Sequence, residues 1–391
     1  MGFSPNNHSR HPLVVRLLLL TAVASMYVAH VTLVVLPPMM WNGDHGGDRE
    51  RTTRWQPLPG VDRWCESLRR ATAPGPYGRT LVHAFVSNSG HLPFLRNALL
   101  SVRRAGLPWR PLVLALGGGV CPALEEEERD QSLSRDDFVC LPYLDRLVDQ
   151  LARDEPESME QIRPYLVTPT AAKGSNSRNS SSTGNAAKFG TIDNTFYGWG
   201  SVEHKFLINA KLYALRDILR CGVDAFLTDT DVAFRGDPRP HFAVPGPRGD
   251  VVAQNDTNDN YELSLNSGFM HWRHTPDTLD LIEDIITVPP FWHVDQARVN
   301  ARMHNRTTPH TLLDARAFPN GWMFLHHFDA LRDDIIVAFH ANFNDKKSQK
   351  VEMLEKMGLW YVSTNDTTTP GASAGTRDKF EEKSLKRRQR R

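Results

Sequence analysis

The residues with the clearest chemical potential in this chain are two aspartates, Asp229 and Asp231, separated by one threonine. They follow an apolar run at residues 224–227 that has the length and composition of a buried β-strand. At the end of a strand, side chains at positions i and i+2 point to the same side, so both carboxylates reach one point. Two converging carboxylates repel each other unless a cation lies between them, and Mn²⁺ or Mg²⁺ shares such oxygens with substrate phosphates. The pair therefore indicates a metal-dependent site for a phosphorylated substrate, although the same triplet also occurs on ordinary solvated loops.

The elements that position this pair begin upstream with an alternation of strand and helix. Residues 80–86 and 111–116 have the pattern of buried strands, and apolar residues recur at helical spacing from 92 to 104 between them. A strand, a helix and a strand in this order predict a parallel pair of strands. A longer helical pattern at 201–219 then leads into the strand at 224–227. Because ligands bind at the carboxyl ends of strands in open sheets of this kind, the aspartate pair lies where a site is expected.

The second half of the chain continues the same alternation of elements. Expected strands lie at 250–253, at 263–272 with a small-residue turn inside it, and at 335–339 just before His340; expected helices lie at 278–286 and 347–357. Gly117, Gly118 and Gly119 lack the Lys-Ser/Thr of a phosphate-binding loop, so they indicate a plain turn. The pattern predicts an α/β fold, with a mostly parallel sheet flanked by helices.

The N-terminus has the pattern of a membrane anchor. Residues 17–36 are apolar over about the length that crosses a bilayer as a helix. Arg10 and Arg16 precede them, which predicts a cytoplasmic tail at 1–16 and a lumenal remainder. A cleaved signal peptide is the alternative, but the run is long and no small-residue cleavage site follows it. We expect a single-pass type II protein of the Golgi membrane, with a stem at 37–78.

The remaining composition is that of a globular protein, with 40% hydrophobic and 23% charged residues. A formal net charge of +1 gives no field that would attract nucleic acid. A folded domain is expected at 79–362, with a flexible low-complexity insertion at 174–185 and a disordered basic tail at 363–391. The four cysteines allow one or two disulfides in a lumen, with no pairing that the sequence can deduce.

Four ordered groups of residues carry a resemblance to a known family. They are residues 87–97; Lys211, residues 219–222 and 226–234, with Asp237 and Pro238; residues 265–269, with Asp295, Gln296 and Asn300; and residues 340–342, with Lys350, Gly358 and Trp360. Together they resemble the plant-type nucleotide-diphospho-sugar transferase family, which includes arabinosyl-, xylosyl- and galactosyltransferases. One departure is Phe234, near which that family often has a tryptophan. The resemblance covers most of residues 80–362 and implies a fold of the GT-A type with a Rossmann-like sheet.

The resemblance also implies roles for individual residues. Asp229, Asp231 and His340 are similar to the family's metal ligands, with Asp229 also contacting the diphosphate-sugar. Asn266, Ser267 and Gly268 resemble the turn that contacts the sugar, and Asp295 with Gln296 resembles the pair that faces the anomeric carbon. Lys211 is expected to contact phosphate.

Each of these residues also has a purely structural interpretation. His340 can be a hydrogen-bonded buried histidine, and residues 266–268 can be a bulge in a strand. Asp295 can be a helix N-cap, and Lys211 can be a solvated helix residue. The sequence leaves these alternatives open.

The function expected from this pattern is transfer of a sugar from a nucleotide-diphosphate donor, a UDP-sugar, to a glycan or glycoprotein. The resemblance favours retention of anomeric configuration with no assigned base, whereas an inverting enzyme would need a carboxylate base, for which Asp295 and Asp256 are candidates. A phosphotransferase or nuclease is a weaker alternative, because the later residues suit a sugar site better. A non-catalytic, transferase-like lumenal protein that binds glycan or assists a partner enzyme is another.

Overall fold

A computed structural model describes residues 61–127, 133–157, 159–160, 162, 201–243, 249–256, 264–287, 294–306, 310–331 and 336–362. The predicted cytoplasmic tail, the anchor at 17–36, the first part of the stem, the insertion at 174–185 and the basic tail lie outside these residues. No helix in the described part of the chain is long and apolar enough to cross a membrane.

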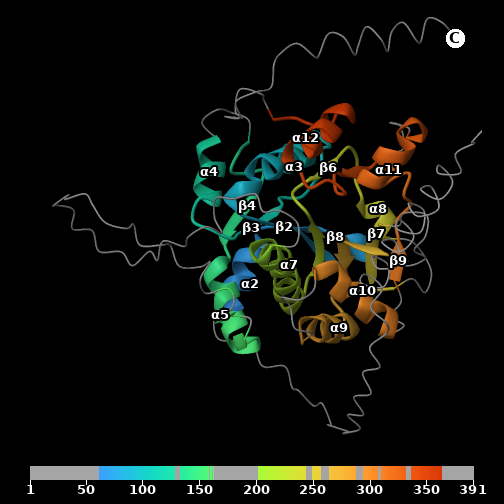
Figure 1. Cartoon of the computed structure of the whole chain (residues 1–391). Helices are drawn as coiled ribbons and strands as arrows, with labels where there is room; N and C mark the ends of the chain where they lie inside the picture. The colour runs from blue at the N-terminus through green and yellow to red at the C-terminus, as the bar shows by residue number, and fades with distance from the viewer. Residues whose placement is uncertain are drawn as a thin grey trace, which may run out of the picture. The chain divides into compact units, whose positions relative to one another are not determined.

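The domain is built on a mixed sheet whose order is β4-β3-β2-β5-β8-β7-β9, with β1 beside β2 (Figure 1). Its strands are β1 (Thr72–Pro74), β2 (Thr80–Ser87), β3 (Leu112–Ala115), β4 (Val139–Pro142), β5 (Asp224–Thr228), β7 (Val251–Asn255), β8 (Leu265–Trp272) and β9 (His310–Leu312). The pairings β2·β3, β2·β5, β3·β4 and β7·β9 are parallel, whereas β1·β2, β5·β8 and β7·β8 are antiparallel. The prediction of an α/β fold with mostly parallel pairing is confirmed.

A second, two-stranded sheet matters most for the site. In it β6 (Val232–Phe234) pairs antiparallel with β10 (Ala338–His340), and His340 lies opposite Val232. The late strand begins later than the predicted run at 335–339 and includes His340; the first residue of that run, Ile335, lies outside the described residues. This pairing brings two segments more than 100 residues apart in the sequence to one place.

Helices cover both faces of the larger sheet (Figure 1). The helices α7 (Val202–Arg220), α9 (Pro276–Thr287) and α10 (Asp295–Arg306) contact one another and bury leucine, isoleucine and valine side chains against β5 and β8. The remaining helices are α2 (Val61–Arg69), α3 (Leu92–Arg104), α4 (Val120–Glu127), α5 (Leu144–Asp154), α8 (Arg239–Phe242), α11 (Gly321–His327) and α12 (Lys347–Lys356). Ser201 caps α7, since its side chain accepts a hydrogen bond from the His204 backbone at 3.0 Å. The predicted helices at 92–104, 201–219, 278–286 and 347–357 all form.

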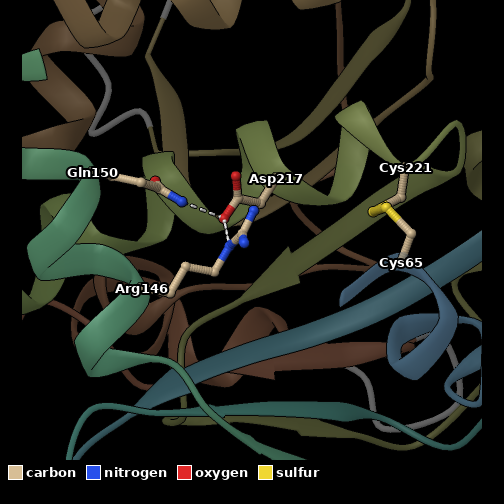
Figure 2. The surroundings of a disulfide bond; sticks show 5 residues. All are labelled: Cys65, Arg146, Gln150, Asp217 and Cys221. Carbon is tan, nitrogen blue, oxygen red and sulfur yellow. Dashed lines mark hydrogen bonds and ion pairs between the residues drawn. A yellow bond between two sulfur atoms is a disulfide. The ribbon is translucent and has the colours of Figure 1, made fainter. Parts of the chain in front are cut away.

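The folded domain starts earlier than the sequence predicted. Residues 61–78, assigned above to the stem, form α2, β1 and the short 3-10 helix η1 (Pro76–Gly78). The strand β1 pairs with β2, and Leu68 and Ala71 are fully buried. A disulfide between Cys65 and Cys221 ties α2 to the end of α7 (Figure 2). The short strand and its proline and glycine neighbours gave no periodic signal, which is why this region resembled a linker.

Strand β8 also differs from its predicted form. The sequence placed a turn at residues 266–268, whereas the structure continues the strand through them and shifts the register of β7 between Ala253 and Gln254. This is the bulge that the structural interpretation of these residues allowed. A bulge re-aims side chains locally, so the irregularity at this point of the sheet orients the polar groups described below.

A network of buried polar side chains joins α5 to α7 (Figure 2). One oxygen of Asp217, Oδ2, accepts hydrogen bonds from Tyr143 Oη at 3.1 Å, Arg146 Nε at 2.5 Å and Gln150 Nε2 at 2.6 Å. Arg216 completes the network through Gln150 Oε1 at 2.9 Å. This network, which we call the α5–α7 network, fixes the helix that carries Lys211.

Candidate active site

Three candidate metal ligands converge where β5, β6 and β10 meet. Asp229 follows β5, Asp231 precedes β6, and His340 ends β10. His340 Nε2 lies 3.2 Å from Asp231 Oδ1 and 3.8 Å from Asp229 Oδ2, and one atom from each side chain falls within 4.8 Å of the others. Two carboxylates and an imidazole form an oxygen- and nitrogen-rich set of ligands that suits Mn²⁺ or Mg²⁺.

Two lysines occupy the remaining oxygens of the same carboxylates. Lys211 Nζ contacts Asp229 Oδ1 at 2.6 Å, and Lys350 Nζ contacts Asp231 Oδ2 at 2.6 Å. Each aspartate therefore uses one oxygen for a lysine and turns its other oxygen toward His340. The division leaves Asp229 Oδ2, Asp231 Oδ1 and His340 Nε2 facing a common point.

Hydrogen bonding behind His340 sets the tautomer of its ring. Gln254 donates from Nε2 to the carbonyls of Phe318 and Pro319 at 3.0 and 3.2 Å, so its Oε1 must act as the acceptor. That oxygen lies 2.9 Å from His340 Nδ1, which therefore carries the proton in a neutral ring. The lone pair of Nε2 is then directed at the two aspartates, as in a metal-binding histidine oriented by a partner behind it.

Gly268 permits the close packing of the ligand cluster. A Cβ at this position would lie 2.7 Å from Asp229 Cγ and 2.7 Å from His340 Cε1, with Asp229 Oδ2 closer still. The carbonyl of Gly268 also accepts a hydrogen bond from the Asp229 backbone at 2.8 Å. Any side chain here would displace both ligands, so the glycine is required by space rather than by backbone conformation.

A second carboxylate, Asp256, collects amide side chains from several elements. Its Oδ1 accepts from Asn266 Nδ2 at 2.7 Å and Asn342 Nδ2 at 3.0 Å, with Asn320 Nδ2 at 3.4 Å. Its Oδ2 accepts from Gln296 Nε2 at 2.7 Å. These bonds fix the orientation of each amide and link β8, α10 and the segment after β10 around one wall of the cavity.

The Asp295–Gln296 pair begins α10 and faces the same space. Asp295 is buried and contacts Lys211 Nζ at 2.9 Å, so Lys211 bridges Asp229 and Asp295. Gln296 Oε1 accepts a hydrogen bond from the Ser267 backbone at 3.3 Å. The interpretation of Lys211 as a solvated helix residue is wrong, because its side chain is 6% exposed between two carboxylates.

These residues surround a cavity of about 490 Å³. Its lining includes the expected residues Lys211, Asp229, Asp231, Asn266, Ser267, Asp295, Gln296 and His340, and additionally Asp256, Asn342, Phe343, Asp345 and Lys350. Gly268 lies behind Asp229, where it makes room for the cluster. The structure thus brings every predicted site residue to one place.

The surrounding charges determine the protonation of the site. Burial alone would raise the pKa of Asp231, but Lys350 and His340 outweigh it and hold that pKa well below the usual range. Burial would lower the pKa of Lys211, whereas Asp229 and Asp295 raise it above its ordinary value. Burial, helped by Lys350, lowers the pKa of His91 to about 4. The site therefore presents an ionised Asp231 and a charged Lys211 next to a neutral His91.

Two residues that complete the site have no role that the sequence alone predicts. Lys350 is part of the family resemblance without an assigned role, and no motif includes Gln254. Lys350 lies ten positions after His340, and its contact with Asp231 depends on how α12 packs beside β6. Gln254 lies where the register between β7 and β8 shifts, and no single-sequence pattern marks such a position.

Comparison with known proteins agrees with the resemblance seen in the sequence. Residues 180–354 match the nucleotide-diphospho-sugar transferase family. The matched segment contains β5, β6, β8 and β10 and all of the proposed metal ligands.

The individual relatives share low sequence identity with this chain. A UDP-galactose:fucoside alpha-3-galactosyltransferase of Dictyostelium discoideum is 23% identical over 193 residues, which is 43% of this chain and 30% of that protein's length. Mouse xyloside xylosyltransferase 1 has a solved structure with 12% identity, covering 68% of this chain and 98% of that one at a TM-score of 0.39. The galactosyltransferase LgtC, solved with donor and acceptor sugar analogues, has 14% identity, covering 72% and 98% at a TM-score of 0.39.

Proposed function

Because this chain carries a nucleotide-diphospho-sugar transferase domain, we propose that it moves a sugar from a UDP-sugar to a hydroxyl of a glycan or glycoprotein with the help of a divalent cation. UDP-galactose is the first donor to test, since the Dictyostelium relative is a UDP-galactose-dependent enzyme. The observation that carries the proposal is the convergence of Asp229, Asp231 and His340 in a cavity lined by two lysines.

The ligand cluster fits a divalent cation in its charge and its chemistry. Asp231 Oδ1 and His340 Nε2 are 3.2 Å apart, close enough for one cation to contact both. Gly268 leaves Asp229 Oδ2 free to turn toward the same point. When bound, Mn²⁺ or Mg²⁺ would neutralise charge on the leaving diphosphate.

The two lysines supply further positive charge for the donor. Lys211 pairs with Asp229 and Lys350 with Asp231, and Lys350 is only 18% exposed. A partly buried ammonium interacts strongly with phosphate oxygens because little water screens it. In the proposed reaction, the bond from the sugar C1 to the UDP oxygen breaks while the acceptor oxygen bonds to C1. The acceptor proton passes to the leaving phosphate.

The arrangement of carboxylates supports retention of configuration. Asp256 already accepts hydrogen bonds from four amide side chains, and Asp295 is held by Lys211 at 2.9 Å. Neither carboxylate is arranged to take a proton from an acceptor hydroxyl, as an inverting reaction requires. Gln296, fixed by Asp256 and Ser267, is proposed to lie beside the anomeric carbon.

We place the enzyme in the Golgi lumen, held by the apolar segment at 17–36. All four cysteines are paired, Cys65 with Cys221 and Cys121 with Cys140, which supports an oxidising compartment. Protease protection of the domain in intact microsomes, with digestion only after detergent, is the expected result. Digestion of the domain in intact vesicles would show that it faces the cytoplasm and would refute the proposed topology.

A donor panel tests the proposed function without knowledge of the acceptor. The full chain, purified in detergent, is incubated with individual UDP-sugars, and release of UDP is followed with water as acceptor. We expect hydrolysis of at least one UDP-sugar, loss of that activity with EDTA and its recovery with added Mn²⁺. Hydrolysis that EDTA leaves unchanged would refute the metal role, and hydrolysis of no donor would favour the non-catalytic alternative.

A further inference from the structure

An aromatic side chain, Phe343, lines the cavity three residues after His340, and a second, Trp322, packs against it. Phe343 lines the cavity and is 43% exposed. Trp322, in α11, lies next to it, with ring centroids 6.2 Å apart and planes inclined by 56°. We call Phe343 and Trp322 the aromatic rim. A large exposed aromatic residue in the wall of a binding cavity is a common feature of ligand sites.

The backbone holds Phe343 in an unfavourable conformation. Its φ is 60°, in the left-handed region, where a bulky side chain is a genuine outlier. Such a residue costs on the order of 1–3 kcal/mol and persists only where its surroundings fix it, most often at a functional site. In the described residues, Tyr77 is the other non-glycine residue with positive φ, and it lies in η1, away from the cavity lining.

Close packing of α11 brings Trp322 to Phe343. A Cβ at Gly321 would lie 2.8 Å from the carbonyl carbon of Asn342 and closer still to its oxygen. The Gly321 backbone instead donates a hydrogen bond to Asn342 Oδ1 at 2.8 Å. Asn342 is in turn bound to Asp256, so the aromatic rim is anchored to the wall that carries the amide side chains.

The chemistry around the aromatic rim is that of carbohydrate recognition. A sugar ring presents a face of C–H groups and an edge of hydroxyls. An aromatic ring packs against the first, and carboxylates and amides bind the second. Asn344 and Asp345 line the cavity next to Phe343 and supply those polar groups.

We propose that the aromatic rim binds a sugar ring of the acceptor and so selects which acceptor hydroxyl reaches the donor. This inference rests on the proposed function. The metal ligands Asp231 and His340 are 6% and 2% exposed, so a donor held by them fills the inner part of the cavity. Phe343 remains exposed to solvent, so its ring is available to a second substrate that enters over the donor.

Three variants isolate the rim. Phe343→Gly removes the ring, and glycine favours the φ of 60° at this position, so folding is preserved. Phe343→Tyr keeps the aromatic ring. Leu325→Ala is the matched control. Leu325 is 51% exposed on α11, the helix that carries Trp322, and it is not among the residues that line the cavity.

The experiment separates acceptor binding from donor use. Binding of the methyl glycosides of galactose, fucose, xylose, arabinose and glucose is titrated by saturation-transfer NMR in the presence of UDP and Mg²⁺. Hydrolysis of the preferred UDP-sugar, with water as acceptor, gives the donor KM for each variant.

We expect wild type, Phe343→Tyr and Leu325→Ala to bind at least one methyl glycoside with similar affinity. Phe343→Gly should weaken that binding about tenfold, as expected when one stacking contact is lost, with donor KM within twofold of wild type.

Unchanged glycoside binding by Phe343→Gly would overturn the inference, as would failure of the wild type to bind any of the five sugars. A tenfold rise in donor KM would assign the rim to the nucleobase instead. Glycoside binding that depends on Phe343, without hydrolysis of any UDP-sugar, would refute the proposed function and leave the rim intact.

Discussion

The domain buries charged groups in two regions, and the two are organised differently. In the α5–α7 network, Asp217 is fully buried, and one of its oxygens receives three donors from α5 and its N-cap residue. In the cavity, Asp229 and Asp231 each give one oxygen to a lysine and turn the other toward His340. The first region faces other helices, whereas the second faces a cavity of about 490 Å³.

The difference distinguishes a structural use of buried charge from a binding one. Removing one partner from a buried charge network leaves the other uncompensated, and the cost appears as lost stability. Removing a charge that faces a cavity chiefly changes what the cavity binds, because the remaining groups retain access to solvent or ligand. The two regions should therefore respond in opposite ways to comparable substitutions.

The largest effect is expected for Asp231→Asn. This change keeps the shape of the side chain but removes a charged metal ligand, so kcat/KM for UDP-sugar hydrolysis should fall by on the order of 1,000-fold. Thermal unfolding should stay near that of wild type. Asp250→Asn is the control, since Asp250 pairs with Arg273 and is not among the cavity-lining residues. Near-wild-type turnover of Asp231→Asn would show that the charge of this cavity aspartate is not needed for hydrolysis.

Asp217→Asn tests the other side of the comparison. The substitution leaves Arg146 without its carboxylate, and we expect a loss of about 3 kcal/mol in the free energy of unfolding. Guanidinium melts measure this loss, with Glu125→Gln as control because its pair with Arg135 is exposed on both sides and contributes little. Hydrolysis of the donor should remain within threefold of wild type at temperatures where the variant is folded. A large fall in kcat with unchanged stability would place Asp217 in the catalytic machinery.

Lys350→Met tests whether Lys350 contributes to catalysis in the cavity or to the stability of the fold. Loss of its ammonium, 2.6 Å from Asp231, should lower kcat/KM about 100-fold through weaker stabilisation of the leaving diphosphate. Lys356→Met in the same helix removes an exposed i,i+4 pair with Glu352 and should have little effect. If Lys350→Met chiefly lowered the melting temperature, Lys350 would be a scaffold residue like Arg146.

Acid pH adds a smaller and separate test, based on histidines buried without charge. Burial lowers the pKa of His271 to about 3, and both of its ring nitrogens lack hydrogen-bond partners in the described structure. The unfolded chain takes up this proton near pH 6.5, whereas the folded protein resists it to about pH 3. The contribution of His271 to the free energy of unfolding is therefore fully present above pH 6.5. It falls on acidification, by about 2 kcal/mol at pH 5.

His271→Phe should remove that contribution to the pH dependence. Phenylalanine preserves the stacking against Phe242, whose ring centroid lies 4.7 Å away. Between pH 6.5 and 4, the slope of unfolding free energy should decrease by about 1.4 kcal/mol per pH unit, the value for one proton. An unchanged slope would assign the acid sensitivity to other groups.

The order of elements and most of the site could be predicted from the sequence because they depend on local patterns. The run before Asp229 forms β5, and the apolar spacing of residues 92–104 forms α3. Roles for His340 and Gln296 required the family resemblance, since nothing local distinguishes them from a core histidine or a surface glutamine.

What escaped prediction depends on contacts between distant segments. The start of the domain at Val61 follows from a bond between Cys65 and Cys221 and from β1 pairing with β2, neither of which has a periodic signature. The amide partners of Asp256 come from β8, α10 and the segments around α11 and β10, so their convergence appears only when the sheet and helices are assembled.

The packing at Gly268 has a consequence for redesign of sugar specificity. With a Cβ excluded by Asp229 and His340, this side of the cavity admits no new side chain without dismantling the ligand cluster. Leu207 and Ile208 of α7 also line the cavity, and they are uncharged. Libraries intended to alter the donor should hold residue 268 constant and diversify Leu207 and Ile208, where larger or smaller side chains change the shape of the cavity while Lys211 and the aspartates are retained.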